Sequence, residues 1–432
     1  MKKVYLVLCI TCLFLIPGPC ILAGGIDNRS NYSGEYARTF TRNAATDSLD
    51  AIAYNPAGVM KMADGYHGNL SIHYVLKEYT NTVDGTALKQ ETPSFVPALF
   101  GLYKNDKWAG FFSFTIPAGG GEVDFKNGNA TTRISAIRLR NMFNQLAGAA
   151  IYGDTADEKL NAEGYYYGLT AGGAYKINDT ISLSFAGRFI DADKKGRAAF
   201  DLMPTSLGTM AGQPVRSAVL DQEENADGWG AILGLGIDLD PVYIGIKYET
   251  ETELDFKYKV KQDTVTGLPY GLGQAVGIIN GAEHERNLPA LFSIGLAYTV
   301  SPKLKIDTGM IYYFQEDAGW GGAEQYIEDG WETSVSIEYK FNDYLKGSIG
   351  YLHTKTGMDA QHALKEAPEL DADSFGAGIV YNIFNETLKI DLGAAIVDYK
   401  GDSYIDTSSG SAVLVGLKKE VVMFSTGVQY RF

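Results

Sequence analysis

Cysteine is nearly absent from this 432-residue chain, and its only three examples, Cys9, Cys12 and Cys20, lie close to the N-terminus. All three fall in a segment that we expect to be removed by cleavage after Ala23. The mature chain would then have no thiol, which argues against disulfides, thiolate metal sites and a cysteine nucleophile.

The chain also lacks a basic surplus and long apolar runs. It has 37 Lys and Arg against 52 Asp and Glu, for a formal net charge of −15. A nucleic-acid binder needs a basic footprint, so this balance argues against one. Only the N-terminus resembles a membrane-spanning apolar run, which argues against a bundle of transmembrane helices. Disorder is disfavoured as well, because aromatic residues make up 12% of the chain.

The N-terminus has the three parts of a secretory signal peptide. Lys2 and Lys3 precede an apolar stretch at Val4–Ile16, and Ala23 supplies a small residue at the cleavage point. A single membrane anchor is the alternative, but 13 apolar residues are too few to cross about 30 Å of hydrocarbon. A lipoprotein signal with Cys20 as the lipidated residue is a further alternative.

What the rest of the chain does have is period-2 alternation. In Trp331–Phe341 every second residue is apolar or aromatic apart from one threonine, and the residues between them are polar or charged. This pattern is typical of a strand with one apolar and one polar face. The same criterion predicts fourteen strands, at 66–80, 92–104, 107–118, 163–177, 180–193, 226–239, 241–258, 286–299, 303–316, 330–341, 344–355, 372–384, 386–400 and 419–432.

The connections between these strands are of two kinds. Six are tight turns, at 105–106, 178–179, 240–241, 301–302, 342–343 and 385. Seven are long, at 81–91, 119–162, 194–225, 259–285, 317–329, 356–371 and 401–418. Short turns at one end and long loops at the other are typical of an all-β transmembrane antiparallel β-barrel in a bacterial outer membrane. A soluble all-β protein is the alternative.

The last strand predicts which face meets lipid. Val422, Phe424, Thr426, Val428, Tyr430 and Phe432 should point outward, and Val421, Met423, Ser425, Gly427, Gln429 and Arg431 should point into the lumen. The ending Tyr430-Arg431-Phe432 resembles the signal by which outer-membrane barrels are recognised by the barrel-assembly machinery. Tyrosines near other strand ends fit aromatic girdles at the two interfaces.

Two regions depart from a plain water-filled barrel. Residues 24–65 precede the first strand, and we expect them to form an N-terminal plug inside the lumen; a separate periplasmic segment is the alternative. In the second and third strands both faces are apolar. Phe95, Leu99, Phe112, Phe114 and Ile116 are assigned to lipid, which leaves Val96, Phe100, Leu102 and Phe111 for the interior. They predict either an apolar lumen pocket or packing against the plug. Pro97 and Pro117 each remove a ladder hydrogen bond, which favours a kink or gap in the wall.

The long loop at 119–162 contains a helical pattern at Arg133–Ile151. Leu139, Met142, Phe143 and Leu146 fall on one face, with Arg138 and Arg140 among the polar residues on the other. An extracellular helix of this kind suits a substrate groove for a carboxylate on an acyl chain, with arginines near the rim. In the alternative reading, the apolar face is covered by neighbouring loops.

A resemblance to a known family rests on the plug. Tyr54-Asn55-Pro56-Ala57-Gly58 resembles the Asn-Pro-Ala plug motif of the FadL/TodX family, the outer-membrane transporters of long-chain fatty acids and other hydrophobic compounds. Upstream residues 36–38 and 43–45 are similar to that family's hatch in general character. The resemblance implies a domain order of signal peptide at 1–23, plug at 24–65 and barrel at 66–432, in the outer membrane of a Gram-negative bacterium.

The resemblance also implies a mechanism. A hydrophobic molecule is captured outside, passes to an internal pocket, and leaves sideways into the membrane lipid after the plug shifts, with Asn55, Pro56, Ala57 and Gly58 as gating residues. The family's internal ligand residues have no match here, so an aromatic hydrocarbon or alkane is as compatible as a fatty acid. A diffusion porin for polar solutes and a surface adhesin are the other functions left open.

Catalytic and metal-binding patterns are not found in the sequence. The five histidines are scattered and no G-x-S-x-G motif occurs, so we expect no enzyme and no cofactor. Acidic pairs such as Asp371 with Asp373 lack the ligand spacing of an EF-hand and read as solvated loop carboxylates rather than a calcium site.

Overall fold

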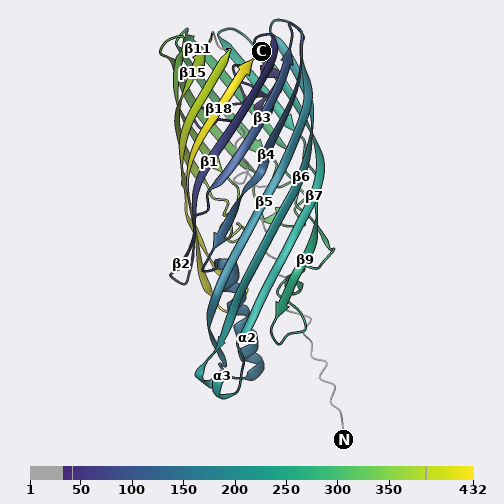
Figure 1. Ribbon diagram of the computed structural model, residues 1–432, viewed down its shortest axis with the longest axis vertical. Helices are drawn as coiled ribbons and strands as arrows, with labels where there is room; N and C mark the ends of the chain where they lie inside the picture. Colours follow the sequence, from purple (N-terminus) through teal and green to yellow (C-terminus); the bar gives the residue numbers. More distant parts are fainter. Residues whose placement is uncertain (1–32, 41, 385–386) are drawn as a thin grey trace.

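The computed structural model describes residues 33–40, 42–384 and 387–432, and the strands in these residues form one antiparallel sheet that closes on itself (Figure 1). Closure is made by β1 against β18, with Gly68 opposite Tyr430 and Val83 opposite Val415. A closed sheet has no unpaired edge, which hydrocarbon would not tolerate. The predicted signal peptide, the first part of the predicted plug and the turn predicted at Asn385 lie outside the described residues.

Fourteen strands of the described residues make up the wall, as the sequence predicts. They are β1 (Gly65–Val83), β3 (Ser94–Lys104), β4 (Trp108–Phe125), β5 (Tyr152–Lys176), β6 (Ile181–Pro204), β7 (Arg216–Asp238), β8 (Val242–Glu249), β11 (Leu291–Ser301), β12 (Leu304–Tyr313), β13 (Gly330–Lys340), β14 (Leu345–Lys355), β15 (Ala372–Ile383), β16 (Leu388–Tyr399) and β18 (Val413–Arg431). Four further strands lie in the long connections: β2 (Thr86–Gln90), β9 (Asp255–Val265), β10 (Glu283–Glu285) and β17 (Asp402–Asp406).

The helical elements of the described residues are few. They are α1 (Ala51–Tyr54), η2 (Pro56–Lys61), α2 (Ala130–Ala147), α3 (Ser206–Met210), η3 (Gln274–Val276) and η4 (Glu324–Tyr326). None of these helices is long and apolar enough to cross a membrane. In Figure 1, α2 and α3 lie at the end of the barrel opposite the C-terminus, where β5, β6 and β7 extend beyond the other strands.

Several strand boundaries differ markedly from the sequence prediction. The strands flanking the loop predicted at 119–162 continue to Phe125 and resume at Tyr152, so this loop is shorter than predicted. The loop predicted at 194–225 is shorter as well, because β6 continues to Pro204 and β7 begins at Arg216. The strand predicted at 241–258 ends at Glu249, and the chain then starts β9, which pairs with the outer part of β7. Alternation continues through β9 because it is also a two-faced strand, so the pattern gives no sign of the break.

Burial follows the predicted faces in β18. Met423, Ser425 and Gln429 are buried, whereas Phe424 and Val428 are exposed on the outer surface. The same test corrects one assignment in β4.

Ile116 was assigned to lipid but is only 3% exposed. The pairing of β4 with β5 shifts by one residue between Thr115 and Ala118, so a bulge turns Ile116 inward.

The outer surface shows where the membrane lies. On β5, Tyr175 and Tyr167 are exposed near the two ends of an apolar stretch, and the exposed Trp229 of β7 lies in register with Leu169, one outward-facing position before Tyr167. Two exposed aspartates, Asp191 of β6 and Asp227 of β7, lie in register with Tyr167 and follow Trp229 at the next outward position. Aromatic residues at both interfaces with charges just beyond them are typical of outer-membrane barrels.

The described part of the N-terminal segment, residues 33–62, lies inside the barrel. Its buried side chains, among them Phe40, Ile52 and Met60, share one core cluster with lumen-facing wall residues such as Phe111 and Met423. Wall glycines allow the close approach. At Gly376 and Gly350 a Cβ would crowd the Phe40 ring, at 2.9 and 3.1 Å.

Candidate functional site

Asn55 follows α1 directly and begins η2, and residues 55–58 lie where the N-terminal segment meets the wall. The Asn55 side chain caps η2, because its Oδ1 accepts a hydrogen bond from the Ala57 N–H at 3.3 Å. Pro56 occupies the first position of η2, where no backbone N–H is needed. Gly58 is required by space, since a Cβ there would collide with the carbonyl oxygen of Ala45.

Asn55 also bonds to the wall. Its Nδ2 donates to the carbonyl oxygen of Leu235 on β7 at 3.1 Å. Glycines make room for this amide, since a Cβ on Gly234 would lie 2.5 Å from Asn55 Oδ1, and one on Gly245 of β8 would lie 2.6 Å from Asn55 Nδ2. A single side chain therefore links the fold of the segment to two neighbouring wall strands.

The first half of the segment is attached by charge. The Arg38 guanidinium donates to Glu338 Oε2 on β13 at 2.8 Å, to Ser348 Oγ on β14 at 3.0 Å and to Asp391 Oδ1 on β16 at 3.0 Å. Glu35 completes this buried group as a further partner of Arg38. Charge-assisted bonds to three strands make Arg38 an anchor between segment and wall.

The electrostatics of Glu35 fit this arrangement. Burial pushes the pKa of its carboxyl up, but the guanidiniums of Arg38 and Arg42 outweigh burial and bring the pKa down to about 2. Arg42 in turn holds Asp50 through two bonds, from Nε at 2.5 Å and from Nη2 at 3.0 Å. The first half of the segment is thus internally cross-linked as well as anchored.

The second half packs against apolar wall instead. Phe100 and Leu102 of β3 and Phe111 of β4 are buried in the same cluster as Ile52 and Met60 of the segment. Val96 is also buried on the lumen side of β3. For Phe100, Leu102 and Phe111, packing against the segment is the one of the two sequence readings that the structure shows.

The backbone ladder of the wall is incomplete along part of one seam, between β3 and β4. These strands pair only from Leu99 opposite Phe114 to Lys104 opposite Ala109. Beyond that point β3 continues to Ser94 paired with β1 alone, and β4 continues to Phe125 paired with β5 alone.

Two bulges in β4 lie beside this seam. They fall between Thr115 and Ala118, around Pro117, and between Gly119 and Gly121. Each bulge adds one residue to β4 relative to β5 and bends the strand away from a regular ladder. Pro117 has no N–H to donate to a neighbouring strand, which agrees with the break in the β3–β4 ladder at this place.

Helix α2 lies over the lumen at the end where the long loops gather. Asn129 begins it with a capping box, in which Oδ1 accepts from the Thr132 N–H at 3.1 Å and Thr132 Oγ1 accepts from the Asn129 N–H at 2.9 Å. Arg138 Nε donates to the carbonyl oxygen of Ser408 at 3.2 Å, and Asn141 Nδ2 to that of Ser409 at 2.9 Å. The helix is therefore tied to the loop that follows β17.

The apolar face of α2 does not line an open groove, which corrects the sequence expectation. Leu139 and Phe143 are 6% and 7% exposed because they pack against Phe200, Leu202 and other residues of the extended strands. Met142 is half-buried at the edge of this cluster, and the polar-face residue Arg140 is half-buried as well.

Leu146 remains open, at 75% exposure. Leu207 and Met210 of α3, at the same end of the barrel, are also exposed. The two helices are joined through Thr205, whose N–H and hydroxyl donate to the carbonyl oxygens of Ile151 and Ala150 at 2.9 and 2.8 Å. An apolar surface therefore exists at the tip, although only one of its residues was expected.

A cluster of cations and aromatic rings lies on the lumen side beneath the loops, and the sequence analysis missed it. Lys194 Nζ of β6 stands 3.6 Å from the ring centroid of Phe256, and the Arg286 guanidinium stands 3.7 Å from that of Trp320. Lys194 also pairs with Glu224 at 3.7 Å. Alternation places residue 194 inward. A lysine at a lumen-facing position was therefore the signal in the sequence that could have indicated this cluster.

A histidine belongs to the same cluster. His284 of β10 stacks on Tyr258 at 4.7 Å between ring centroids. Burial, with the cations Lys194 and Arg286 nearby, lowers the pKa of this imidazole to about 4, so it is neutral near pH 7. The cluster therefore presents positive charge and aromatic surface together.

The acidic pair at Asp371 and Asp373 is occupied by protein groups. Asp371 accepts from the Thr356 N–H at 2.9 Å and pairs with Lys355, while Asp373 accepts from Tyr351 and contacts His353. No group of three or more candidate metal ligands is found among the described residues.

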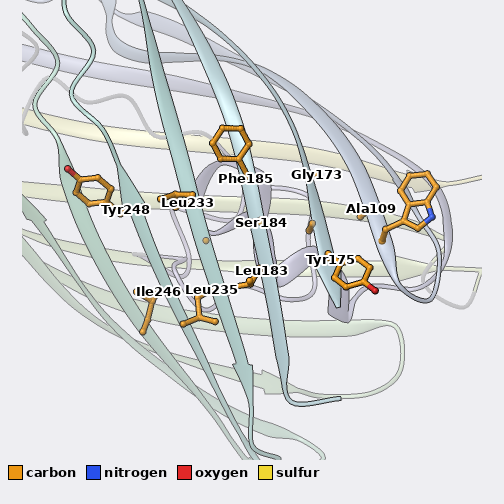
Figure 2. A pocket seen from close by; sticks show the side chains of 13 residues that line it. Ala109, Gly173, Tyr175, Leu183, Ser184, Phe185, Leu233, Leu235, Ile246 and Tyr248 are labelled. Carbon is orange, nitrogen blue, oxygen red and sulfur yellow. The ribbon is translucent and has the colours of Figure 1, made fainter. Parts of the chain in front are cut away.

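A hollow of about 770 Å³ on the outer face of the wall is a separate feature. Figure 2 shows it lined by Tyr175, Phe185, Leu233 and Tyr248, which are exposed outward from β5, β6, β7 and β8. The hollow faces lipid, and the wall separates it from the N-terminal segment in the lumen. It is therefore not the path through the lumen.

Comparison with known proteins gives a consistent result. A family model described as "Outer membrane protein transport protein (OMPP1/FadL/TodX)" matches residues 20–432. Among solved structures, a FadL homologue of Pseudomonas aeruginosa is similar with a TM-score of 0.68 at 15% identity, over 94% of this chain and 100% of that one. The toluene transporter TodX of P. putida has a TM-score of 0.64 at 13% identity, over 94% and 99% of the two chains.

The toluene transporter TbuX of Ralstonia pickettii has a TM-score of 0.62 at 15% identity, over 94% and 99%. No curated protein matches this sequence. The family model covers nearly the whole chain, so this protein belongs to the OMPP1/FadL/TodX family of outer-membrane transport proteins.

Proposed function

We propose that this barrel carries hydrophobic small molecules from outside the cell into the outer membrane, with residues 33–62 acting as a movable plug. The observation that supports it most is the β3–β4 seam, where an incomplete ladder lies beside the apolar wall of the lumen. An apolar molecule leaving through such a seam enters hydrocarbon directly and never crosses water. The family to which the chain belongs and the similar solved transporters also support transport of hydrophobic molecules through the outer membrane.

Capture would begin at the tip of the barrel. Leu146, Leu207 and Met210 offer exposed apolar surface there. The covered residues Leu139 and Phe143 support the helix from below instead of touching substrate. The cation–aromatic cluster around Lys194 and Arg286 then offers an internal contact for aromatic rings or for the carboxylate of a fatty acid.

The plug supplies the gate. Its first half is anchored by the buried ion pairs of Arg38. Its second half, from Ala51 to Lys61, meets the wall through apolar contacts, through hydrogen bonds of Asn55 with Leu235, Lys247 with Ala53 and Ser182 with Ala57, and through the partly exposed ion pair of Lys61 with Asp238. Apolar contacts and hydrogen bonds to backbone carbonyls resist separation less than buried ion pairs, so the second half is the part that would move. Asn55, Pro56, Ala57 and Gly58 would act as its hinge and latch.

A general diffusion porin is less well supported. The described lumen contains a segment packed against the wall on several sides, whereas a porin keeps a water-filled path. An adhesin has no specific observation in its favour. At the end of β18 the Phe432 ring is 79% exposed and 4.8 Å from that of Tyr430, which supports our proposal that the barrel-assembly machinery recognises this pair.

The test is to regularise β4. Deleting Pro117 and Gly120 removes the extra residue from each bulge, which should extend the β3–β4 ladder and narrow the seam. Uptake of labelled oleate and toluene is measured in a bacterium without its own transporters, with assembly checked by heat-modified gel mobility.

We expect uptake well above the empty vector for the natural chain and near the vector level for the deletion. Natural-chain uptake equal to vector would contradict hydrophobic transport altogether. Full uptake by an assembled deletion variant would contradict lateral exit at this seam but would still agree with hydrophobic transport through the barrel.

A further inference from the structure

The hollow on the outer face of the wall begins at the level of the lipid head groups. Two of its lining residues, Trp108 at the start of β4 and Tyr175 near the end of β5, are exposed outward beside the tight turns of the chain. Exposed aromatic residues of this kind mark a membrane interface, and the tight turns of an outer-membrane barrel lie on its periplasmic side. The hollow therefore opens at the surface of the periplasmic leaflet and continues into its hydrocarbon.

A glycine and its large neighbours give the hollow its shape. Gly173 is exposed on the outer face of β5, and it has no side chain to fill the space beside Phe185, its partner on β6. Across the next two strands the same row continues with Leu233 of β7 and Tyr248 of β8 (Figure 2). The resulting volume of about 770 Å³ lies within the range of about 300–1,000 Å³ that is usual for small-molecule sites.

The position of the hollow restricts what can occupy it. Apart from Ser184, every lining residue is glycine, apolar or aromatic. The ladders from β5 to β8 are unbroken at this height, so an occupant arrives from the membrane and not from the lumen. At the mouth, Lys107 is exposed one residue before Trp108, where the phosphate of a head group would lie. A phospholipid, with an apolar chain and a phosphate head, meets all of these conditions.

The same stretch of wall holds the plug from the other side. The side chain of Leu235 lines the hollow, while its carbonyl oxygen accepts the hydrogen bond from Asn55 Nδ2 at 3.1 Å. Gly234 lines the hollow as well, and a Cβ added to it would lie 2.5 Å from Asn55 Oδ1 in the lumen. The thickness of one strand therefore separates a ligand in the hollow from Asn55.

We propose that one acyl chain of a periplasmic-leaflet phospholipid binds in this hollow and stabilises the seated plug by packing against β7 at Leu235. The inference rests on the proposed function, because it names a ligand that regulates the plug of that function. A bound chain restricts the motion of β7 through van der Waals contacts, and a fixed β7 holds the carbonyl to which Asn55 bonds. Such coupling is reciprocal, so the Asn55 bond also favours binding of the lipid.

The first part of the experiment measures binding. The barrel is placed in phosphatidylethanolamine nanodiscs that contain some phosphatidylethanolamine with a diazirine on one acyl chain, and peptide mass spectrometry locates the adducts after illumination. Leu233→Trp fills the hollow from its outer side. The control, Leu392→Trp, makes the same change at a similarly exposed leucine of β16. A diazirine fatty acid replaces the lipid probe in a parallel sample.

We expect lipid adducts at the hollow to be several-fold more abundant than on the outer face of β13–β16. Leu233→Trp should bring them down to that level, and Leu392→Trp should leave them unchanged. Uniform labelling of the outer face, or undiminished labelling of the hollow in Leu233→Trp, would overturn the site. Labelling of the hollow by the fatty acid alone would overturn it too, as would a dimer in which a second copy of the chain excludes lipid from the hollow.

The second part of the experiment tests the coupling with Asn55→Ala, which changes only the lumen side of the wall. Lipid labelling of the hollow should fall by up to about fivefold, the size of one ordinary hydrogen bond, while labelling of β13–β16 stays constant. Unchanged labelling of the hollow in an assembled Asn55→Ala barrel would overturn regulation of the plug by lipid. Uptake of oleate and toluene is measured separately, and uptake equal to vector with the expected adducts in place would contradict the proposed function alone.

Discussion

Replacing Arg38 by alanine should loosen the plug, because Arg38 is the cation shared by three buried wall and segment carboxylates. Its guanidinium lies 2.8 Å from Glu338 and 3.0 Å from Asp391, and it also pairs with Glu35. Removing one partner of a buried ion pair costs about 3–5 kcal/mol, because the other charge is left without compensation.

The lower end of that range applies here. Glu338 keeps a second cation, Lys346, at 3.3 Å, whereas Asp391 pairs with no other cation among the described residues. A loss of about 3 kcal/mol shifts the equilibrium between seated and released plug by roughly 100-fold. The Arg38→Ala barrel should therefore spend about 100 times more of its time in conducting states.

Conductance of the purified barrel in planar bilayers measures this directly. The natural chain should show rare openings, and Arg38→Ala frequent ones. Adding Asp391→Asn should restore part of the closure, because the double variant no longer buries an uncompensated carboxylate. An assembled Arg38→Ala barrel that stays as closed as the natural chain, within about threefold, would refute the view that Arg38 anchors the plug.

Three further predictions concern the same parts. Phe100→Ala should leave a cavity between β3 and the plug at a cost of about 3–5 kcal/mol, seen as faster protease cleavage of the plug, while unchanged cleavage would mean that the contact is not needed. Glu35, with a pKa of about 2 in place and about 4.5 when free, contributes its stabilisation fully above about pH 4.5 and loses it as the pH falls from 4.5 to 2. Conductance measured over that interval should therefore rise as the pH falls, and a flat profile there would mean that Glu35 does not help to seat the plug. Asn129→Ala removes the cap of α2 at a cost of about 1 kcal/mol, which should speed amide exchange in its first turn roughly fivefold and leave α3 unaffected.

The wall was predictable from sequence because a two-faced strand repeats every two residues whatever its neighbours are. Met423 and Phe424 could be assigned to opposite faces for that reason alone. The prediction failed where an extra residue resets the repeat, as at Ile116, and where one alternating stretch belongs to two strands with different partners, as at β8 and β9.

The site was less predictable because its contacts are distant in sequence. The ion pairs of Arg38 join residues 300 and 353 positions apart, and no local pattern reports them. The periodicity of residues 133–151 was enough to predict that α2 is a helix. Whether Leu139 is exposed could not be predicted, because it depends on the extended strands that cover this residue. Asn55 was found only through a family motif, since its bond to Leu235 leaves no trace in the alternation.

The central claim is that hydrophobic molecules enter through a barrel gated by its plug. Uptake of labelled oleate and toluene by a bacterium lacking its own transporters, for the natural chain, Asn55→Ala and an empty vector at matched outer-membrane levels, tests it most directly. We expect uptake by the natural chain well above vector and a marked reduction in Asn55→Ala, whose plug has lost its cap and its bond to β7. Uptake equal to vector for both compounds, with the natural barrel assembled and conducting ions steadily, would contradict plug-gated uptake and favour a porin.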